Sequence, residues 1–460
     1  MARKYNRDLI LNGNINKAIL SIAVPIVINS FIQTMYNLTD TFWLGKIGTN
    51  PMAAITLVSP VQNIIMNFGS GITAAGAILV SQYIGAKEDK QAKSMTNHIF
   101  VCSMLFSIIC ASLCFIATPN IITWLKAEGD IYRFSKTYLQ TVVLDMPFLF
   151  MINIFAGVNQ AQGDTVRPML LNFLGVAINL ILDPLFLVVF NWGVFGAAFA
   201  TLLAKVPCAI IALILLSSKK NAVRLELKGF HFEKEKIRSI IKIGLPTAIG
   251  GSTMQFGFLL MSKNVYKYGA FATAAYGIGN KINGLISLPS NGIGSATSTI
   301  VGQNIGAKQY DRAKQGYRKA MHMAVCFLFV GGLILSRPFI ARPIVSIFSD
   351  DAEVIRMATE FLSLMAICCW TNGIYNSTMG LFQGSGHTMV TMAVDATRLW
   401  VFRFMTLFVC EKVLHMGVSS IWYSVVVSNA LSSLILYILY RTNIWRKEAI
   451  KIKRSAEPAA

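Results

Sequence analysis

Two aspartates interrupt long apolar segments of the chain, and each follows a polar side chain by four positions. Asp40 follows Tyr36, and Asp183 follows Asn179. Residues four apart share a helix face, so each carboxylate would be presented beside its polar partner. Pro184 lacks a backbone N–H and therefore frees a carbonyl nearby. This spacing indicates either an ion or proton site, or hydrogen-bonded carboxylates that hold helices together.

The segments that carry these carboxylates are typical of an integral membrane protein. Of the 460 residues, 54% are hydrophobic and 13% are charged, whereas soluble domains carry roughly a quarter of charged residues. A formal net charge of +20 would suit nucleic-acid binding, but runs of about 20 uncharged residues would not. The composition also excludes a disordered chain and a disulfide-stapled secreted domain. A carboxylate at mid-bilayer costs about 2.5–3.5 kcal/mol, so each one needs a reason.

Twelve apolar stretches predict an all-α polytopic fold with twelve transmembrane helices. Transmembrane β-strands would instead show alternating segments of about ten residues. The expected spans are 16–44, 53–84, 95–117, 134–161, 168–190, 193–216, 239–266, 273–305, 316–340, 355–383, 389–411 and 416–440. All eight cysteines lie in apolar stretches without CxxC spacing, which indicates packing rather than disulfides or metal ligands.

The two halves of the chain repeat each other. A shift of 221 residues places Pro25 on Pro246 and Ile84–Lys87 on Ile305–Lys308. Further matches at this shift are Gly48 with Gly269, Gly71 with Gly292 and Gln82 with Gln303. Because six spans is an even number, the repeats share one orientation, with a pseudo-twofold axis along the membrane normal. This predicts two six-helix lobes with a substrate path between them.

Lys and Arg gather in every other loop, which predicts that these loops and both termini are cytoplasmic. The expected organisation is an N-terminal six-helix lobe (1–217), a cytoplasmic inter-lobe linker (218–238), a C-terminal six-helix lobe (239–441) and a basic cytoplasmic tail (442–460). Gly71, inside an apolar span with no preceding strand, indicates close helix packing rather than a phosphate loop.

The repeat shows that the two carboxylates belong to one lobe only. Asp40 aligns with Met261, and Asp183 aligns with Thr406. The fold therefore does not require an acid at these positions, which favours an ion or proton site over a purely structural role.

Other charges inside the apolar spans give weaker indications. Asp395 and Arg398 are three apart on one helix and are expected to pair, with Arg403 in the same network. Asp145, close to one end of its span, is expected at the membrane interface, and the sequence does not reveal its role. Lys205 is expected to extend to the headgroups.

Several of these motifs resemble the multidrug and toxic compound extrusion (MATE) transporters. They are Ile22–Pro25, Gln33–Thr41, Gly85–Lys87, Gln162–Thr165 and Asn179–Phe186. The resemblance covers nearly the whole chain, including its twelve-span, two-lobe plan, and is greatest with the prokaryotic DinF-like branch, in which the N-terminal lobe holds the essential acids.

The resemblance implies a cation site in the N-terminal lobe. The matching positions are Asp40, Asn179, Asp183, Thr201 and the backbone of Ala197. Hard oxygen ligands suit Na⁺, while two close carboxylates in a low dielectric also exchange protons, so the sequence leaves Na⁺ and H⁺ open.

The resemblance also implies a substrate cavity lined by Tyr36, Tyr138 and Asn153, although interfacial aromatics and helix-packing amides would look the same. Pro25 weakens the first span and is the expected hinge. The implied function is a Na⁺- or H⁺-coupled multidrug antiporter. It would export organic, cationic, amphipathic compounds by alternating access, with ion loading at Asp40 and Asp183 lowering the affinity for drug.

A lipid-linked oligosaccharide or lipid flippase of the same superfamily is the alternative, and it would carry a more cationic cavity. An enzyme would need a nucleophile–base pair or a metal-ligand cluster, and the sequence indicates neither. We therefore expect no cofactor besides the coupling ion. The expected partners are small organic molecules and the lipid bilayer, without nucleic acid. The chain is expected to act as a monomer in a prokaryotic cytoplasmic membrane.

Overall fold

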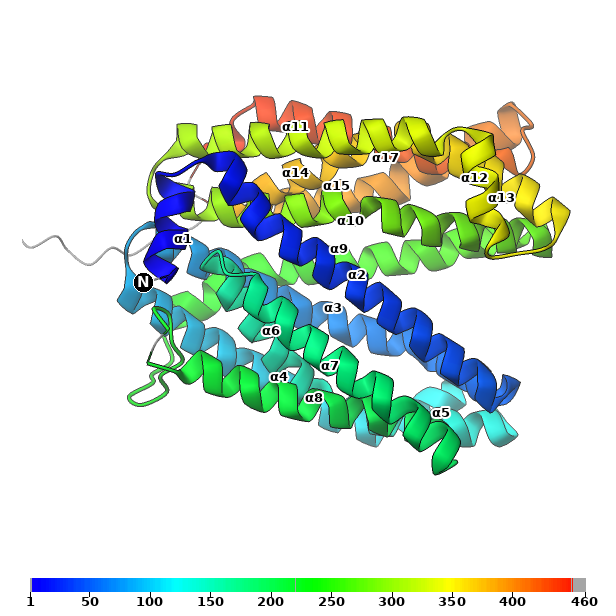
Figure 1. Cartoon of the computed structure of the whole chain (residues 1–460), viewed down its shortest axis with the longest axis horizontal. Helices are drawn as coiled ribbons and strands as arrows, with labels where there is room; N and C mark the ends of the chain where they lie inside the picture. Colours follow the sequence, from blue (N-terminus) through cyan, green and yellow to red (C-terminus); the bar gives the residue numbers. More distant parts are fainter. Residues whose placement is uncertain (1, 220, 448, 450–460) are drawn as a thin grey trace, which may run out of the picture. The chain divides into compact units, whose positions relative to one another are not determined.

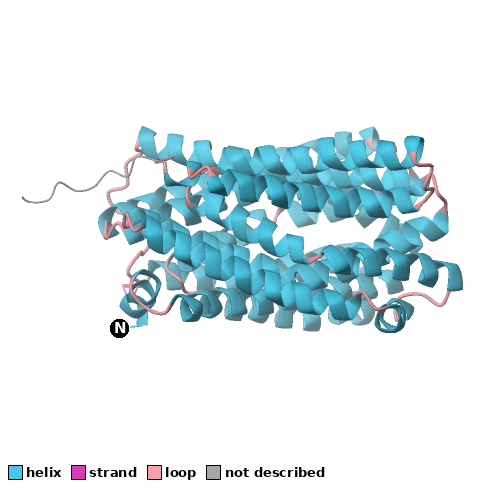
Figure 2. Ribbon diagram, turned by 90° about the horizontal axis from the view of Figure 1, so that it is seen from above, coloured by secondary structure: helices cyan, strands magenta, loops and turns pink. Residues whose placement is uncertain are grey.

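The computed structural model describes residues 2–219, 221–447 and 449, so the expected basic tail lies outside the described residues from position 450 onward. The described part is almost entirely helical and contains no strand (Figure 2). Its helices form twelve consecutive spanning segments, which confirms the all-α polytopic fold.

The chain forms two compact units. In the described part, unit 1 comprises residues 2–7 and Ile28–Ala248, and unit 2 comprises Asp8–Val27 and residues 249–447. Figure 1 labels the helices of both units.

Unit 1 contains most of the first repeat. Its helices are the C-terminal part of α2 (Ile15–Ile47), α3 (Thr49–Gly85), α4 (Asp89–Trp124), α5 (Gly129–Val143), α6 (Met146–Ala161), α7 (Val166–Pro184), the π-helical turn η1 (Leu185–Val189), α8 (Gly193–Ser217) and the N-terminal part of α9 (Lys234–Tyr266). The change to η1 follows directly after Pro184, whose missing N–H interrupts the regular hydrogen-bond ladder.

Unit 2 contains most of the second repeat. Its helices are the end of α1 (Ala2–Leu11), the start of α2, the remainder of α9, α10 (Ala270–Gly306), α11 (Tyr310–Leu335), α12 (Pro338–Ser346), α13 (Ala352–Cys368), α14 (Trp370–Gly384), α15 (Thr388–Ala396), η2 (Thr397–Arg403), α16 (Phe404–Phe408), η3 (Val409–Val413), α17 (Ser419–Arg441) and η4 (Ile444–Arg446). Here η2 and η3 are π-helical and η4 is a 3₁₀ turn.

The spanning segments differ in length and regularity. In the described part, seven helices are long and apolar enough to cross a membrane alone, and two bent pairs bring the number to nine. The pair α5 and α6 bends by 44°, and the pair α13 and α14 bends by 55°. The other three segments are α9, α10 and the run from α15 to η3. Small and polar residues in α9 and α10, and the interruptions between α15 and η3, explain their weaker apolar signal.

Two helices are divided between the units. α2 passes from unit 2 to unit 1 after Val27, two residues beyond Pro25. α9 passes from unit 1 to unit 2 after Ala248, two residues beyond Pro246. Proline removes one helical hydrogen bond and crowds the carbonyl four residues earlier, so both helices change unit where their backbone is weakest.

Close packing holds each exchanged helix segment in its unit. A Cβ at Gly71 of α3 would lie 2.5 Å from the carbonyl oxygen of Gly244. In unit 2, a Cβ at Gly292 of α10 would lie 2.5 Å from the Val27 side chain and 3.1 Å from the carbonyl oxygen of Ala23. The same shift of 221 residues relates the two contacts. The expectation of close packing at Gly71 is therefore confirmed.

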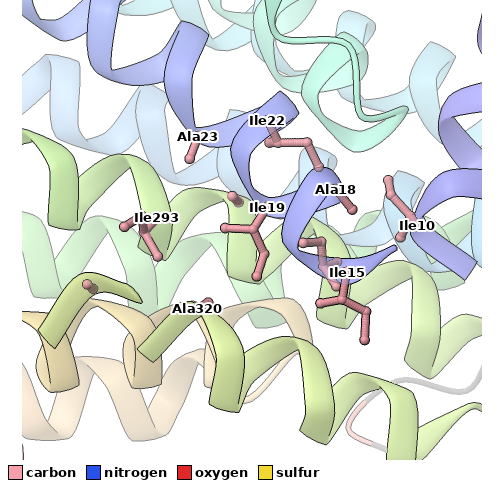
Figure 3. Close-up of a cluster of buried hydrophobic side chains, with 11 residues drawn as sticks. Ile10, Ile15, Ala18, Ile19, Ile22, Ala23, Ile293 and Ala320 are labelled. Carbon is pink, nitrogen blue, oxygen red and sulfur yellow. The ribbon is translucent and has the colours of Figure 1, made fainter. Parts of the chain in front are cut away.

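The start of α2 also completes an apolar core in unit 2. Figure 3 shows its isoleucines and alanines facing α10 and α11. The cluster comprises Ile10, Ile15, Ala18, Ile19, Ile22, Ala23, Ile293, Ala296, Ile300, Ala320 and Ala324. The α2 helix is begun by Asn14, whose side chain accepts hydrogen bonds from the backbone N–H groups of Asn16 and Lys17.

In unit 1, the segment between α8 and α9 docks on the first turns of α4. His98 Nδ1 lies 2.7 Å from the Ser94 carbonyl and donates to it, while Nε2 accepts from the backbone N–H of Glu233 at 2.8 Å. The Lys236 ammonium lies 2.6 Å from both Glu233 Oε1 and Ser94 Oγ. His98 also packs edge-on against Phe230. These contacts fix the chain immediately before α9.

Candidate functional site

Unit 1 encloses a cavity of about 670 Å³ between α2, α3, α5, α6, α7 and α8. The wall combines apolar side chains such as Met66 and Phe155 with an unusual number of polar ones. The polar lining residues are Asn29, Gln33, Tyr36, Asn37, Asp40, Gln62, Asn63, Ser70, Tyr138, Asn153, Asn172, Asn179, Thr201 and Lys205. A cavity of this size and character suits a small amphipathic molecule.

The end of α7 presents two buried oxygen atoms that lack hydrogen-bond partners. Asn179 Nδ2 donates to Asp183 Oδ1 at 3.2 Å, as the four-residue spacing predicts. Asp183 is fully buried, and neither its Oδ2 nor Asn179 Oδ1 has a partner. An unsatisfied buried acceptor costs about 1–3 kcal/mol. A cation or a proton at these oxygens would remove that cost.

The other residues of the predicted cation site lie on α2 and α8. Asp40 and Thr201 line the same cavity as Asn179, while Asp183 and Ala197 lie behind its wall. Thr201 Oγ1 donates to the Ala197 carbonyl at 3.2 Å, and the charges of Asp40 and Asp183 are close enough to interact. The structure therefore brings all five predicted residues into one unit, three of them in the cavity wall.

The predicted substrate residues line this cavity too. Tyr36 comes from α2, Tyr138 from α5 and Asn153 from α6. A chain of amides that the sequence did not single out extends the polar wall. Asn172 Nδ2 donates to Asn29 Oδ1 at 2.8 Å and lies 3.3 Å from Gln33 Oε1.

Asp145 and Lys205 form an ion pair beside the cavity, with Lys205 Nζ 2.5 Å from Asp145 Oδ2. Asp145 is only 2% exposed. Lys205 therefore extends to a buried carboxylate and not to the headgroups, and Asp145 lies inside the unit. Both sequence-based expectations for these residues are wrong. Two opposite charges within apolar spans of one lobe were the available signal, because such charges usually pair.

Unit 2 contains a second cavity, of about 680 Å³, in which the charges differ. Asp395, Arg398 and Arg403 line it. Arg398 Nη2 lies 3.9 Å from Asp395 Oδ1, which confirms the expected pair. Asp395 also accepts a hydrogen bond from the Tyr375 hydroxyl.

A family model decides what kind of protein carries these cavities. The MatE model matches residues 25–185 and 246–409, which fall on the two repeats. The chain belongs to the MatE family. A MatE protein is a membrane transporter and not an enzyme, so that expectation is confirmed.

Curated relatives resemble this MatE protein over most of its length. The multidrug export protein MepA of Staphylococcus aureus is 26% identical over 80% of this chain and 82% of its own. A protein of Thermotoga maritima named "Probable multidrug resistance protein NorM" is 23% identical over 95% of this chain and 94% of its own.

Solved structures share the fold. A crystal structure of MATE in complex with MaL6 has a TM-score of 0.90 at 22% identity, covering 95% of this chain and 98% of that one. A MOP superfamily transporter from Pyrococcus furiosus, described as having a binding pocket of reverse polarity, has a TM-score of 0.89 at 23% identity, with the same coverage. The agreement confirms the twelve-helix, two-lobe architecture.

Proposed function

We propose that this MatE protein is a cation-coupled multidrug antiporter that exports organic, cationic, amphipathic compounds by alternating access. The observation that carries the proposal is the buried Asp183 beside Asn179, with unpartnered oxygens next to a drug-sized cavity. The names of the multidrug export and resistance relatives support the same class of substrate. The cell would hold the protein in a prokaryotic cytoplasmic membrane as a monomer with both termini inside.

The cation site of the proposal consists of Asp40, Asn179, Asp183, Thr201 and the backbone of Ala197. Carboxylate, amide, hydroxyl and carbonyl oxygens are the ligands that Na⁺ accepts. A proton on one carboxylate would equally relieve the repulsion between Asp40 and Asp183. The proposal therefore names Na⁺ or H⁺ as the coupling ion.

The substrate site lies in the same cavity. Tyr36, Tyr138 and Asn153 supply aromatic faces and an amide, and Asp40 supplies a negative charge for a cationic compound. Ion binding at Asp40 and Asp183 neutralises that charge, so the ion and the cationic drug compete for one electrostatic environment. This competition couples inward ion movement to outward drug movement.

Alternation between the two sides would use Pro25 as a hinge. Pro25 precedes by two residues the point at which α2 passes from one unit to the other. A change in α2 at this proline would move Tyr36 and Asp40 without disturbing the α2 core of unit 2.

Reconstitution in liposomes tests the proposal. Ethidium efflux is measured under an imposed Na⁺ gradient and, separately, under an imposed pH gradient. One gradient should drive efflux by the wild type, and Asp40→Asn should lose that response. Asp130→Asn, which changes an exposed carboxylate in the first turn of α5, is the matched control and should keep it. Wild-type efflux from Asp40→Asn at equal protein content would refute the coupling role.

A further inference from the structure

The cavity of unit 2 takes no part in the proposed coupling mechanism, yet it is as large as the cavity of unit 1. Its volume of about 680 Å³ lies within the range of small-molecule pockets. Apolar and aromatic side chains line part of it, including Met254, Phe258 and Tyr276. Amides from α10, α14 and α17 line the rest, including Asn283 and Asn376.

Arg403 places a buried positive charge in this cavity. Its side chain is only 3% exposed. Nε donates to Ser428 Oγ at 3.1 Å, and Nη2 donates to Asn429 Oδ1 at 3.2 Å. Both partners are uncharged, and no described carboxylate lies within 4.0 Å of the Arg403 guanidinium. A buried charge without a counter-charge is costly, which indicates that a missing anion belongs here.

Arg398 is also incompletely satisfied. Its Nε is buried and has no hydrogen-bond partner. Nη2 contacts the Met254 sulfur at 3.1 Å, a weak acceptor, and the guanidinium lies over the Tyr375 ring at 4.4 Å. Asp395 is 3.9 Å away and already accepts from Tyr375. One carboxylate thus faces two guanidinium groups, which leaves an excess of one positive charge.

We propose that the unit 2 cavity binds an amphipathic organic anion, whose single carboxylate is held by Arg398 and Arg403. A guanidinium matches a carboxylate through parallel N–H···O bonds, and one negative charge balances the excess. The aromatic and apolar wall accommodates the rest of the molecule. This site is separate from the proposed cation site, since all its lining residues belong to unit 2.

Fluorescence binding to the purified full-length chain in lipid nanodiscs tests this proposal. The probe is dansylglycine, which carries one carboxylate on an apolar fluorophore. Its neutral amide, dansylglycinamide, is the matched control compound. Dansylglycine should bind about 10- to 100-fold more tightly than the amide, because charged hydrogen bonds to the two arginines are lost with the carboxylate.

The variants should act in opposite directions. Arg398→Gln and Arg403→Gln should each weaken dansylglycine binding about tenfold or more and leave binding of the amide unchanged. Asp395→Asn removes the competing negative charge and should strengthen dansylglycine binding. Asp40→Asn should leave it unchanged, although the same substitution abolishes coupled efflux. Failure of the anion site and failure of the proposed antiport are therefore distinguishable.

Three results would overturn the proposal. They are equal binding of dansylglycine and its amide, a loss of binding in Asp395→Asn as large as in Arg398→Gln, and displacement of dansylglycine by inorganic phosphate as effective as by benzoate. The last result would identify a site for inorganic anions instead. If Arg403→Gln does not fold, the more accessible Arg398 still decides the outcome through Arg398→Gln and Arg398→Lys, of which only the lysine variant should retain part of the binding.

Discussion

The two cavities occupy corresponding repeats of one fold but carry opposite charge. In unit 1, Asp145 is neutralised by Lys205, so Asp40 and Asp183 remain as an excess of two carboxylates. In unit 2, a single carboxylate, Asp395, is set against two guanidinium groups. A duplicated scaffold has thus kept its helices and its cavity volume while the charges inside diverged. The repeat preserves the architecture, and the charged residues assign different ligands to the two halves.

The largest expected effect distinguishes the carboxylate of α7 from its counterpart in the other repeat. Asp183→Asn should reduce gradient-driven ethidium efflux about 5- to 150-fold, the range of a typical coupling free energy. Thr406→Ala, at the aligned position in unit 2, should leave efflux unchanged. Both are measured in liposomes at equal protein content. A similar loss in both variants would mean that the two repeats contribute equally to coupling.

Buried charges should respond differently to removal in the two units. Lys205→Met leaves Asp145 buried without its partner and should destabilise the protein by about 3–5 kcal/mol. The double variant Lys205→Met with Asp145→Leu should recover most of that loss. Arg403→Met strands no carboxylate and should cost much less. Thermal unfolding in detergent provides the measurement, and equal losses for Lys205→Met and Arg403→Met would break the comparison.

The glycine contacts of the two exchanged segments provide a finer comparison. Gly71→Ala forces a methyl group against the backbone of Gly244, whereas Gly292→Ala meets mainly the side chain of Val27. We expect both to destabilise by about 1–3 kcal/mol, with the larger loss for Gly71→Ala, because a backbone yields less than a side chain. Gly277→Ala, which has open space on α10, is the control and should be neutral or stabilising. The order of the melting temperatures checks the prediction.

The smallest effect concerns pH. Partial burial raises the pKa of Glu233, but hydrogen bonds from Lys236 and Ser94 outweigh it, so the pKa is lowered from its ordinary value. A lowered pKa contributes stability above the ordinary value of Glu, and that stability is lost as the pH falls through the pKa of the folded state. Glu233→Gln should therefore lower the melting temperature slightly at pH 7 and have no effect in strong acid.

Unit 2 offers a matched control for the pH experiment. Arg312 of α11 holds the segment before α2 by donating to the carbonyl oxygens of Ile10 and Gly13. The backbone carbonyls do not titrate, and a guanidinium stays charged throughout this range. Arg312→Gln should therefore destabilise to the same extent from neutral to acid pH. A pH-independent effect of Glu233→Gln would refute the assigned role of its carboxylate.

The sequence predicted the helices well because a spanning segment leaves a local signal. The expected span 53–84 corresponds to α3, and 193–216 corresponds to α8. Asn179 and Asp183 were also predictable as neighbours, since four residues make about one helical turn. The residues around the two carboxylates lie in one cavity for the same reason: each is on a helix whose face is readable.

Contacts between helices distant in sequence were not predictable in this way. Asp145 and Lys205 are 60 residues apart, and neither flanking pattern indicates the other. The passage of α2 and α9 between units is likewise invisible, because matching sequences on both halves are compatible with exchanged or unexchanged helix starts. The short helix α12, which the sequence joined in part to the preceding span, required the tertiary structure as well.

The division of α2 and α9 also constrains how the chain matures during synthesis. Ile15–Ala23 leave the ribosome early, but their partners on α10 and α11 are translated more than 250 residues later. Conversely, the first half of the chain lacks the Gly244 segment until translation has passed the inter-repeat connection. Neither half can complete its own interior alone, so both must wait in the membrane for full-length translation. Assembly is thus concerted, and a chain truncated between the repeats leaves two unfinished units.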